Sequence, residues 1–172
     1  LFAAKDFQAG QGQLITDEVN GGNLFYRMQT IFHYNELMRQ DTSQPLSHRD
    51  VYYPSVGLFL VHSATMDLAV KAGDNADSHN HNDTGSVTLY KNGHPILVDI
   101  GVETYTQKTF SPRRYEIWTM QSGYHNLPAI CGKDQKDGEE YRAENVVTEL
   151  TGTEPSISME LAAAYPDAGA IV

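Results

Sequence analysis

The chain has 172 residues, 40% of them hydrophobic, and a formal net charge of −10. This length supports one compact core with an appendage rather than two large domains. The acidic balance argues against a nucleic-acid-binding surface. No apolar run approaches the roughly 20 residues needed to cross a bilayer, and residues 1–6 lack a signal-peptide pattern. Because the chain starts without Met and ends in an apolar run, we expect it to be a piece of a longer protein.

The N-terminal part has the pattern of a helix. Between Asn23 and Arg39, apolar and aromatic residues recur at helical spacing, with Gly21-Gly22 before them and a Pro-containing stretch after. This predicts one amphipathic helix in a helical segment of residues 1–45. Tyr26 and Tyr34 are expected to be packing residues.

The remainder, residues 46–172, reads as a β domain. From Val51 onward, short β-rich runs are separated by Gly, Asn, Asp and Pro. The fold class is therefore mostly β, an antiparallel β-sandwich with one N-terminal helix. The predicted strands are residues 53–61, 67–72, 85–90, 95–99, 118–121, 126–130, 142–150 and 156–163.

One hairpin can be predicted in register. Asn92-Gly93 between two alternating segments favours a two-residue type I′ turn. If Lys91 pairs with His94, the pairing continues as Leu89 with Ile96, Val87 with Val98, and Ser86 with Asp99. Val87, Leu89, Ile96 and Val98 would then face the core and Asp99 would point away from it. Asp99 also comes to the open end of the hairpin, near the arriving His81.

Three residues offer a metal site. Asp99 follows His81 by 18 positions and His125 follows Asp99 by 26. Two imidazoles and a carboxylate suit zinc and leave a fourth position open, although such long gaps are no signature by themselves. The alternative is that each histidine is a hydrogen-bonded structural or surface residue.

His79 stands two positions before His81, so an extended backbone would put both on one side. An unligated histidine beside a metal site could carry protons near neutral pH. Asn80, Asn82 and Asp83 are expected to orient the loop through bonds to the backbone. Lys108, Arg113 and Arg114 form the one compact basic cluster in the sequence, which is either a solvated loop or a local anion site.

Several blocks in order resemble the heparinase II/III-like family of polysaccharide lyases. They are Ser78–Ser86, Asp99–Tyr105, Arg114–Ser122 and His125–Pro128. The resemblance is good from Val51 onward and looser in the helix. It implies an α-helical toroid followed by stacked antiparallel sheets, so the chain would be the β-sandwich part, truncated at its C-terminus, with the last toroid helix attached.

The resemblance also implies roles. His81, Asp99 and His125 correspond to zinc ligands, and His79 to a catalytic histidine of β-elimination from uronate-containing polysaccharides. Arg113 and Arg114 would bind the acidic sugar by paired hydrogen bonds. The family takes its catalytic tyrosine from the toroid, so the isolated chain is expected to be nearly inactive. The toroid of the same protein and an acidic polysaccharide are the expected partners, with no nucleic acid or membrane. A homodimer stays open, and the family implies a periplasmic or secreted location.

Two other functions stay open. One is a carbohydrate-binding or structural β-module in which the histidines only support the fold. The other is a zinc hydrolase, because a His–Asp–His site with an open position activates water.

Overall fold

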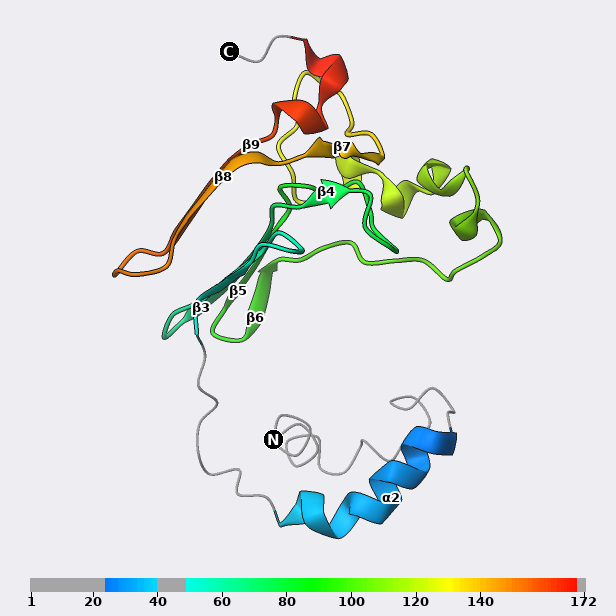
Figure 1. The fold of residues 1–172 in the computed structure, drawn as a ribbon, viewed down its shortest axis with the longest axis vertical. Helices are drawn as coiled ribbons and strands as arrows, with labels where there is room; N and C mark the ends of the chain where they lie inside the picture. Colours follow the sequence, from blue (N-terminus) through cyan, green and yellow to red (C-terminus); the bar gives the residue numbers. More distant parts are fainter. Residues whose placement is uncertain (1–23, 40–48, 170–172) are drawn as a thin grey trace. The chain divides into compact units, whose positions relative to one another are not determined.

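The structure is a computed structural model that describes residues 24–39 and 49–169. The chain divides into two compact units, residues 1–47 and 48–172, which are described separately (Figure 1). In the first unit, helix α2 spans Leu24–Met38, one residue shorter at each end than predicted. Tyr34 is exposed on this helix. No helix among the described residues is long and apolar enough to cross a membrane.

The second unit is built on a five-stranded antiparallel sheet in the order β1-β2-β3-β5-β6. The strands are β1 (Val51–Tyr53), β2 (Leu58–His62), β3 (Met66–Lys71), β5 (Val87–Lys91) and β6 (His94–Leu97). The mostly β, antiparallel fold is therefore confirmed. Phe59 of β2 and Val70 of β3 are buried and are paired across the two strands.

Two further strand pairs complete the unit. Strand β4 (Asp74–Asn75) pairs with β7 (Gly138–Arg142), and β8 (Glu144–Glu149) pairs with β9 (Ser156–Glu160). Side chains of the large sheet and of β9 line one apolar cleft of about 560 Å³, with Phe59 and Val70 on one side and Ile157 and Met159 on the other. The β8–β9 hairpin is thus the second layer over this sheet (Figure 1).

Some predicted strands are wrong. Residues 53–61 contain the turn between β1 and β2, and residues 142–150 divide between β7 and β8. Residues 118–121 form a 3₁₀ turn, and residues 126–130 contribute only an isolated bridge. In this region the backbone bonds locally, from residue i to i+3, in successive short 3₁₀ helices: Lys108–Phe110, Arg114–Glu116, Trp118–Met120 and Ser122–Tyr124. Two more follow at Ala162–Ala164 and Pro166–Ala168.

The β5–β6 hairpin is correct at its turn and wrong beyond it. Asn92 and Gly93 both have positive φ, 51° and 74°, as a type I′ turn requires, and Lys91 pairs with His94. A register shift between Leu89 and Tyr90 then puts Leu89 opposite Leu97 instead of Ile96. A bulge inserts one residue into a strand, so every later predicted pair is displaced. The predicted core face of β6 is also wrong, because the whole strand is exposed.

Beyond the end of β6, the Asn126 side chain makes the hydrogen bonds that link β5 to the following segment. The Asn126 side-chain amide donates to the carbonyl of Val87 at 3.0 Å and to that of Val98 at 2.9 Å. The backbone N–H of Val87 in turn donates to the Asn126 carbonyl at 3.2 Å. Asn126 therefore links β5 to the segment leaving β6, and the residue before it, His125, is brought to the sheet edge.

Beside this edge lies a buried polar cluster. The Gln135 side chain accepts from the Asn75 amide at 2.9 Å and from the Thr84 N–H at 3.2 Å, and donates to the Thr84 carbonyl at 2.7 Å. All three residues are at most 4% exposed. Gly85, which follows Thr84, has φ 91°, and a Cβ there would lie 2.8 Å from the Leu161 side chain. The approach to β5 is thus closely fixed.

Candidate metal and catalytic site

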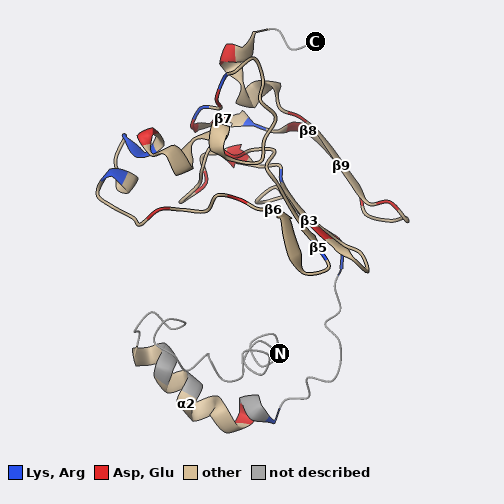
Figure 2. Ribbon diagram, turned by 180° about the vertical axis from the view of Figure 1, so that it is seen from behind, with Lys and Arg blue, Asp and Glu red and all other residues tan. Residues whose placement is uncertain are grey.

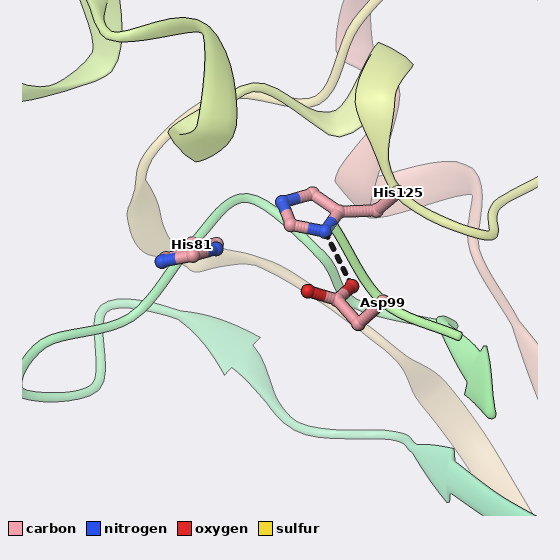
Figure 3. A group of neighbouring side chains, drawn as sticks. All are labelled: His81, Asp99 and His125. Carbon is pink, nitrogen blue, oxygen red and sulfur yellow. Dashed lines mark hydrogen bonds and ion pairs between the residues drawn. The ribbon is translucent and has the colours of Figure 1, made fainter. Parts of the chain in front are cut away.

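The three residues predicted as metal ligands lie together (Figure 3). His81 comes from the loop between β4 and β5, Asp99 from just beyond β6, and His125 from the end of the last 3₁₀ turn of that run. Each offers a ligand atom, and these atoms lie within 4.8 Å of one another. The rings of His81 and His125 are 5.1 Å apart, and Asp99 Oδ2 lies 2.6 Å from His125 Nδ1.

The geometry fits a small ion after slight closure. Ligand atoms at 2.0–2.1 Å from a tetrahedral zinc ion lie about 3.3 Å from one another. The separations in the set therefore exceed that spacing by at most about 1.5 Å, a distance that side-chain rotation covers. His125 adds independent support, because its Nε2 is buried and has no hydrogen-bond partner among the described residues. Buried nitrogens are nearly always bonded to a protein group, water or an ion.

The charge state of His81 suits a ligand. Burial lowers the pKa of His81 below its ordinary value of 6.5, and neighbouring His125 lowers it further, while Asp83 and Asp99 oppose the shift. Neutral imidazole is the form that binds a metal, so no proton needs to be displaced at neutral pH.

His79 belongs to a different group of side chains. Its φ is 63°, in the left-handed region, so the predicted extended backbone through His79 is wrong. For a non-glycine residue this conformation costs roughly 1–2 kcal/mol. The exposed His79 ring stacks with Tyr105 at 5.9 Å and meets the edge of Phe110 at 6.1 Å, whereas His81 faces His125. His79 therefore lies among aromatic side chains, whereas His81 lies in the candidate metal set.

The side chains of Asn80 and Asn82 bond to backbone carbonyls, as predicted for residues that orient the loop. The Asn80 amide donates to the His81 carbonyl at 3.1 Å, and the Asn82 amide donates to the Gln135 carbonyl at 3.3 Å. Asp83 forms an ion pair with Lys71 on β3. These contacts tie the loop to the sheet and to the buried polar cluster.

The predicted basic cluster separates into two parts. Lys108 and Arg113 both pair with the carboxylate of Glu116, at 3.1 and 2.8 Å. The hydrogen bond from Arg113, and then that from Lys108, lowers the pKa of Glu116 to about 2. Arg114 instead donates to the carbonyls of Asn80 and Thr109. Elsewhere in the unit, acidic and basic segments are interspersed (Figure 2).

Several residues that hold the site were missed by the sequence reasoning. Gln135 and Asn126 anchor the neighbours of His81 and His125, and Tyr115 donates to the Asn80 side chain at 2.8 Å. Trp118 donates from its indole to Glu103, which ties down the segment after Asp99. A single polar residue in a loop has no periodic pattern, so Gln135 carried no signal. Tyr115, Trp118 and Asn126 lie in blocks that carry the family resemblance.

A β-rich unit with a His–Asp–His set at one sheet edge, and a further histidine beside it, defines a candidate metal-dependent or metal-stabilised domain. The family profile "Heparinase II/III-like, C-terminal" matches residues 46–163, more than half of the chain. The chain therefore belongs to the heparinase II/III-like family through its C-terminal domain, a family of polysaccharide lyases. A search among curated proteins finds no match for the chain.

Proposed function

We propose that this chain is the β-sandwich part of a lyase that cleaves uronate-containing polysaccharides by β-elimination, with zinc held by His81, Asp99 and His125. The observation that carries the proposal is the pairing of an exposed His79 with a converging His–Asp–His set two residues away. Family membership supports the reaction class. The substrate class and the zinc ion are our inference.

Zinc is proposed from the donor set. Two imidazoles and one carboxylate are typical of zinc with an open fourth position. When bound, the ion would supply a fixed positive charge at this edge of the sheet and lock together the three segments that carry its ligands.

His79 is proposed as the residue that meets the sugar. In β-elimination a base removes the proton α to the uronate carboxyl group, and the electron pair of that C–H bond forms the carbon–carbon double bond. The bond to the 4-linked oxygen breaks, its electron pair stays on that oxygen, and the oxygen takes up a proton. A histidine can neutralise the carboxylate or exchange a proton with these groups near neutral pH. The exposed ring of His79 is accessible for either task.

Arg113 is the proposed contact for an acidic group of the glycan. It lines an open cavity of about 260 Å³ together with Gln107, Lys108 and Ser111. Its side chain is 69% exposed and binds only the neighbouring Glu116 carboxylate among the described residues, so a sugar carboxylate can exchange with that partner. The sequence also predicted substrate binding by Arg114, whose guanidinium donates to the carbonyls of Asn80 and Thr109.

Activity is proposed to need residues from the helical toroid that the family places before this domain. The isolated chain is then expected to bind zinc but to cleave little. An acidic polysaccharide and that toroid are the proposed partners, and a periplasmic or secreted location is proposed with them.

The test is the ultraviolet absorbance of the unsaturated uronate product, measured with the full-length protein on a panel of acidic glycans. No product from any glycan would overturn the lyase assignment. His79→Ala should abolish product while zinc content stays the same. His81→Ala should lower the zinc content measured by elemental analysis, and an unchanged zinc content would remove the metal assignment.

A carbohydrate-binding role without chemistry is the second candidate, and the exposed aromatic rings favour it. Tyr105 and Phe110 are 41% and 68% exposed and pack edge to face at 5.5 Å beside His79. Exposed aromatic patches mark ligand or partner sites. Phe110→Ala should weaken glycan binding in calorimetry under either candidate, and only the lyase also forms the unsaturated product.

A further inference from the structure

Residues 78–83 carry both histidines but belong to no strand. Their backbone makes a turn bond from the Asn80 N–H to the Asp77 carbonyl at 3.2 Å and a bond from the Asn82 N–H to the Met120 carbonyl at 3.0 Å. An irregular segment keeps one conformation only where its polar groups are satisfied by partners elsewhere. The groups that hold Asn80, between the two histidines, therefore decide where both imidazoles lie.

Asn80 is bonded through its backbone and its side chain. It is 9% exposed, its side-chain oxygen accepts from the Tyr115 hydroxyl at 2.8 Å, and its amide donates to the His81 carbonyl at 3.1 Å. Its own carbonyl accepts from Arg114 Nε at 3.2 Å and Nη2 at 2.8 Å. The Arg114 guanidinium thus binds the carbonyl of the peptide group that joins Asn80 to His81.

The third bond of Arg114 fixes the guanidinium itself. Nη1 donates to the carbonyl of Thr109 at 3.0 Å, and Thr109 is only 3% exposed. One planar group therefore bridges the histidine loop and the 3₁₀ turn at Lys108–Phe110, whose Phe110 ring meets His79. A rigid fork of N–H donors suits two separate carbonyls, whereas a lysine ammonium has no such geometry.

The preceding arginine provides a contrast. Arg113 is exposed, and its guanidinium binds only the Glu116 carboxylate three residues along the chain. Among the described residues Arg114 forms no ion pair, and its guanidinium donates three hydrogen bonds to main-chain carbonyls. Arg113 therefore binds a side-chain carboxylate of its own turn, whereas Arg114 binds the backbone of other segments.

We propose that Arg114 is a positioning residue of this site. By holding the Asn80 carbonyl it keeps His79 in its left-handed conformation, beside Tyr105 and Phe110, and keeps His81 turned toward His125. This differs from a role in binding the sugar. Its effects on zinc and turnover rest on the proposed function, whereas the contact itself does not.

The two histidines should depend on Arg114 unequally. His81 has a second anchor at Asn82, whose N–H binds the Met120 carbonyl and whose amide binds the Gln135 carbonyl. His79 has no equivalent anchor on its other side among the described residues, because Ser78 and Asp77 are exposed turn residues. Loss of Arg114 should therefore disturb His79 more than the metal set.

The experiment compares Arg114→Ala and Arg114→Lys with Arg113→Ala as the matched control, all in the full-length protein. Three quantities are measured: hydrogen exchange of peptides covering residues 78–83, zinc affinity by competition with a chromophoric chelator, and kcat and KM on the glycan that the wild type cleaves. Exchange reports on the loop whether or not the protein is a lyase.

For Arg114→Ala we expect faster exchange at residues 78–83, a fall in kcat of about 10- to 100-fold and a smaller loss of zinc affinity, since partners of functional side chains typically contribute this much. Arg114→Lys should not restore them. Arg113→Ala should leave exchange and zinc affinity unchanged and raise KM. If Arg114→Ala fails to fold, Tyr115→Phe removes one bond to Asn80 and should move the same quantities less.

Unchanged exchange at residues 78–83 in Arg114→Ala would overturn the positioning role, as would a rise in KM alone that Arg114→Lys repairs, because that is the behaviour of a sugar contact. A wild type that neither binds zinc nor cleaves any glycan would instead overturn the proposed function, and the exchange result would still decide the role of Arg114.

Discussion

Removing the side-chain amide of Asn126 should weaken both the fold and the metal site. Asn126→Ala deletes the bonds to the carbonyls of Val87 and Val98, at 3.0 and 2.9 Å. A hydrogen bond of this kind contributes roughly 0.5–1.5 kcal/mol net. The carbonyl of Val98 can be rehydrated because that contact is exposed, so the expected total is about 1–2 kcal/mol of unfolding free energy. In a unit of this size that lowers Tm by about 3–10 °C.

The same change should loosen His125, the next residue along the chain. Its ring would no longer be held at the sheet edge, and we expect zinc affinity to fall about 10-fold. The assays are thermal unfolding in the presence of a chelator and chelator competition for zinc. Asn126→Asp, which keeps the shape but cannot donate, should be at least as damaging. Thr153→Ala, on the exposed turn between β8 and β9, is the control.

Two outcomes would refute this reasoning. An unchanged Tm in Asn126→Ala would mean that the two bonds contribute nothing to folding. A lower Tm with unchanged zinc affinity would mean that the link stabilises the sheet without placing His125.

Three more predictions follow from single side chains. Burial and His125 lower the pKa of His81 in the folded state. As pH falls below about 6.5, the unfolded chain therefore takes up this proton before the folded chain does. The unfolding free energy of the metal-free protein should decrease from that pH down to the folded-state pKa of His81. His81→Asn should remove that part of the slope in urea titrations, and an identical slope would contradict it. Gln135→Leu leaves the Thr84 N–H and carbonyl unpaired in a buried setting and should cost about 2–4 kcal/mol in urea unfolding, against little change if water replaces the amide. His79→Gly, which tolerates a φ of 63°, should be more stable than His79→Ala by about 1 kcal/mol while both lack activity, and equal stabilities would argue against strain there.

The sequence was sufficient for features set by local chemistry. Asn92-Gly93 predicted its turn because few dipeptides accept two positive φ angles, and a short β-rich run between turn residues predicted the strand β3. The approach of Asp99 to His81 was also predicted, since a hairpin returns the chain to the edge where the His-containing loop arrives. His125 joined the set through its residue type and the family resemblance, and the three do lie together. These inferences depend on geometry within a few residues of each motif.

The remaining features depend on contacts between distant segments. The register shift between Leu89 and Tyr90 has no mark of its own in the sequence, yet it puts Leu89 opposite Leu97 in place of the predicted Ile96. The apolar run around Trp118 reads as a strand but folds into 3₁₀ turns. The roles of Gln135 and Asn126 arise from side-chain bonds to residues at least 28 positions away. Periodicity reports which face of an element is buried and is silent about such single bonds.

The two histidines show what a spacing pattern leaves open. In an extended segment His79 and His81 would project to the same side and would compete for one ion. The positive φ of His79 breaks that alternation, so one short block contributes His81 to the metal set and leaves His79 beside Tyr105. A left-handed histidine persists only where its surroundings over-determine it, and such strain is concentrated at functional sites. The conformation that separates the two roles is therefore maintained by the neighbours of the block, above all by the bonds to Asn80, which is why the residues of the block alone could not reveal it.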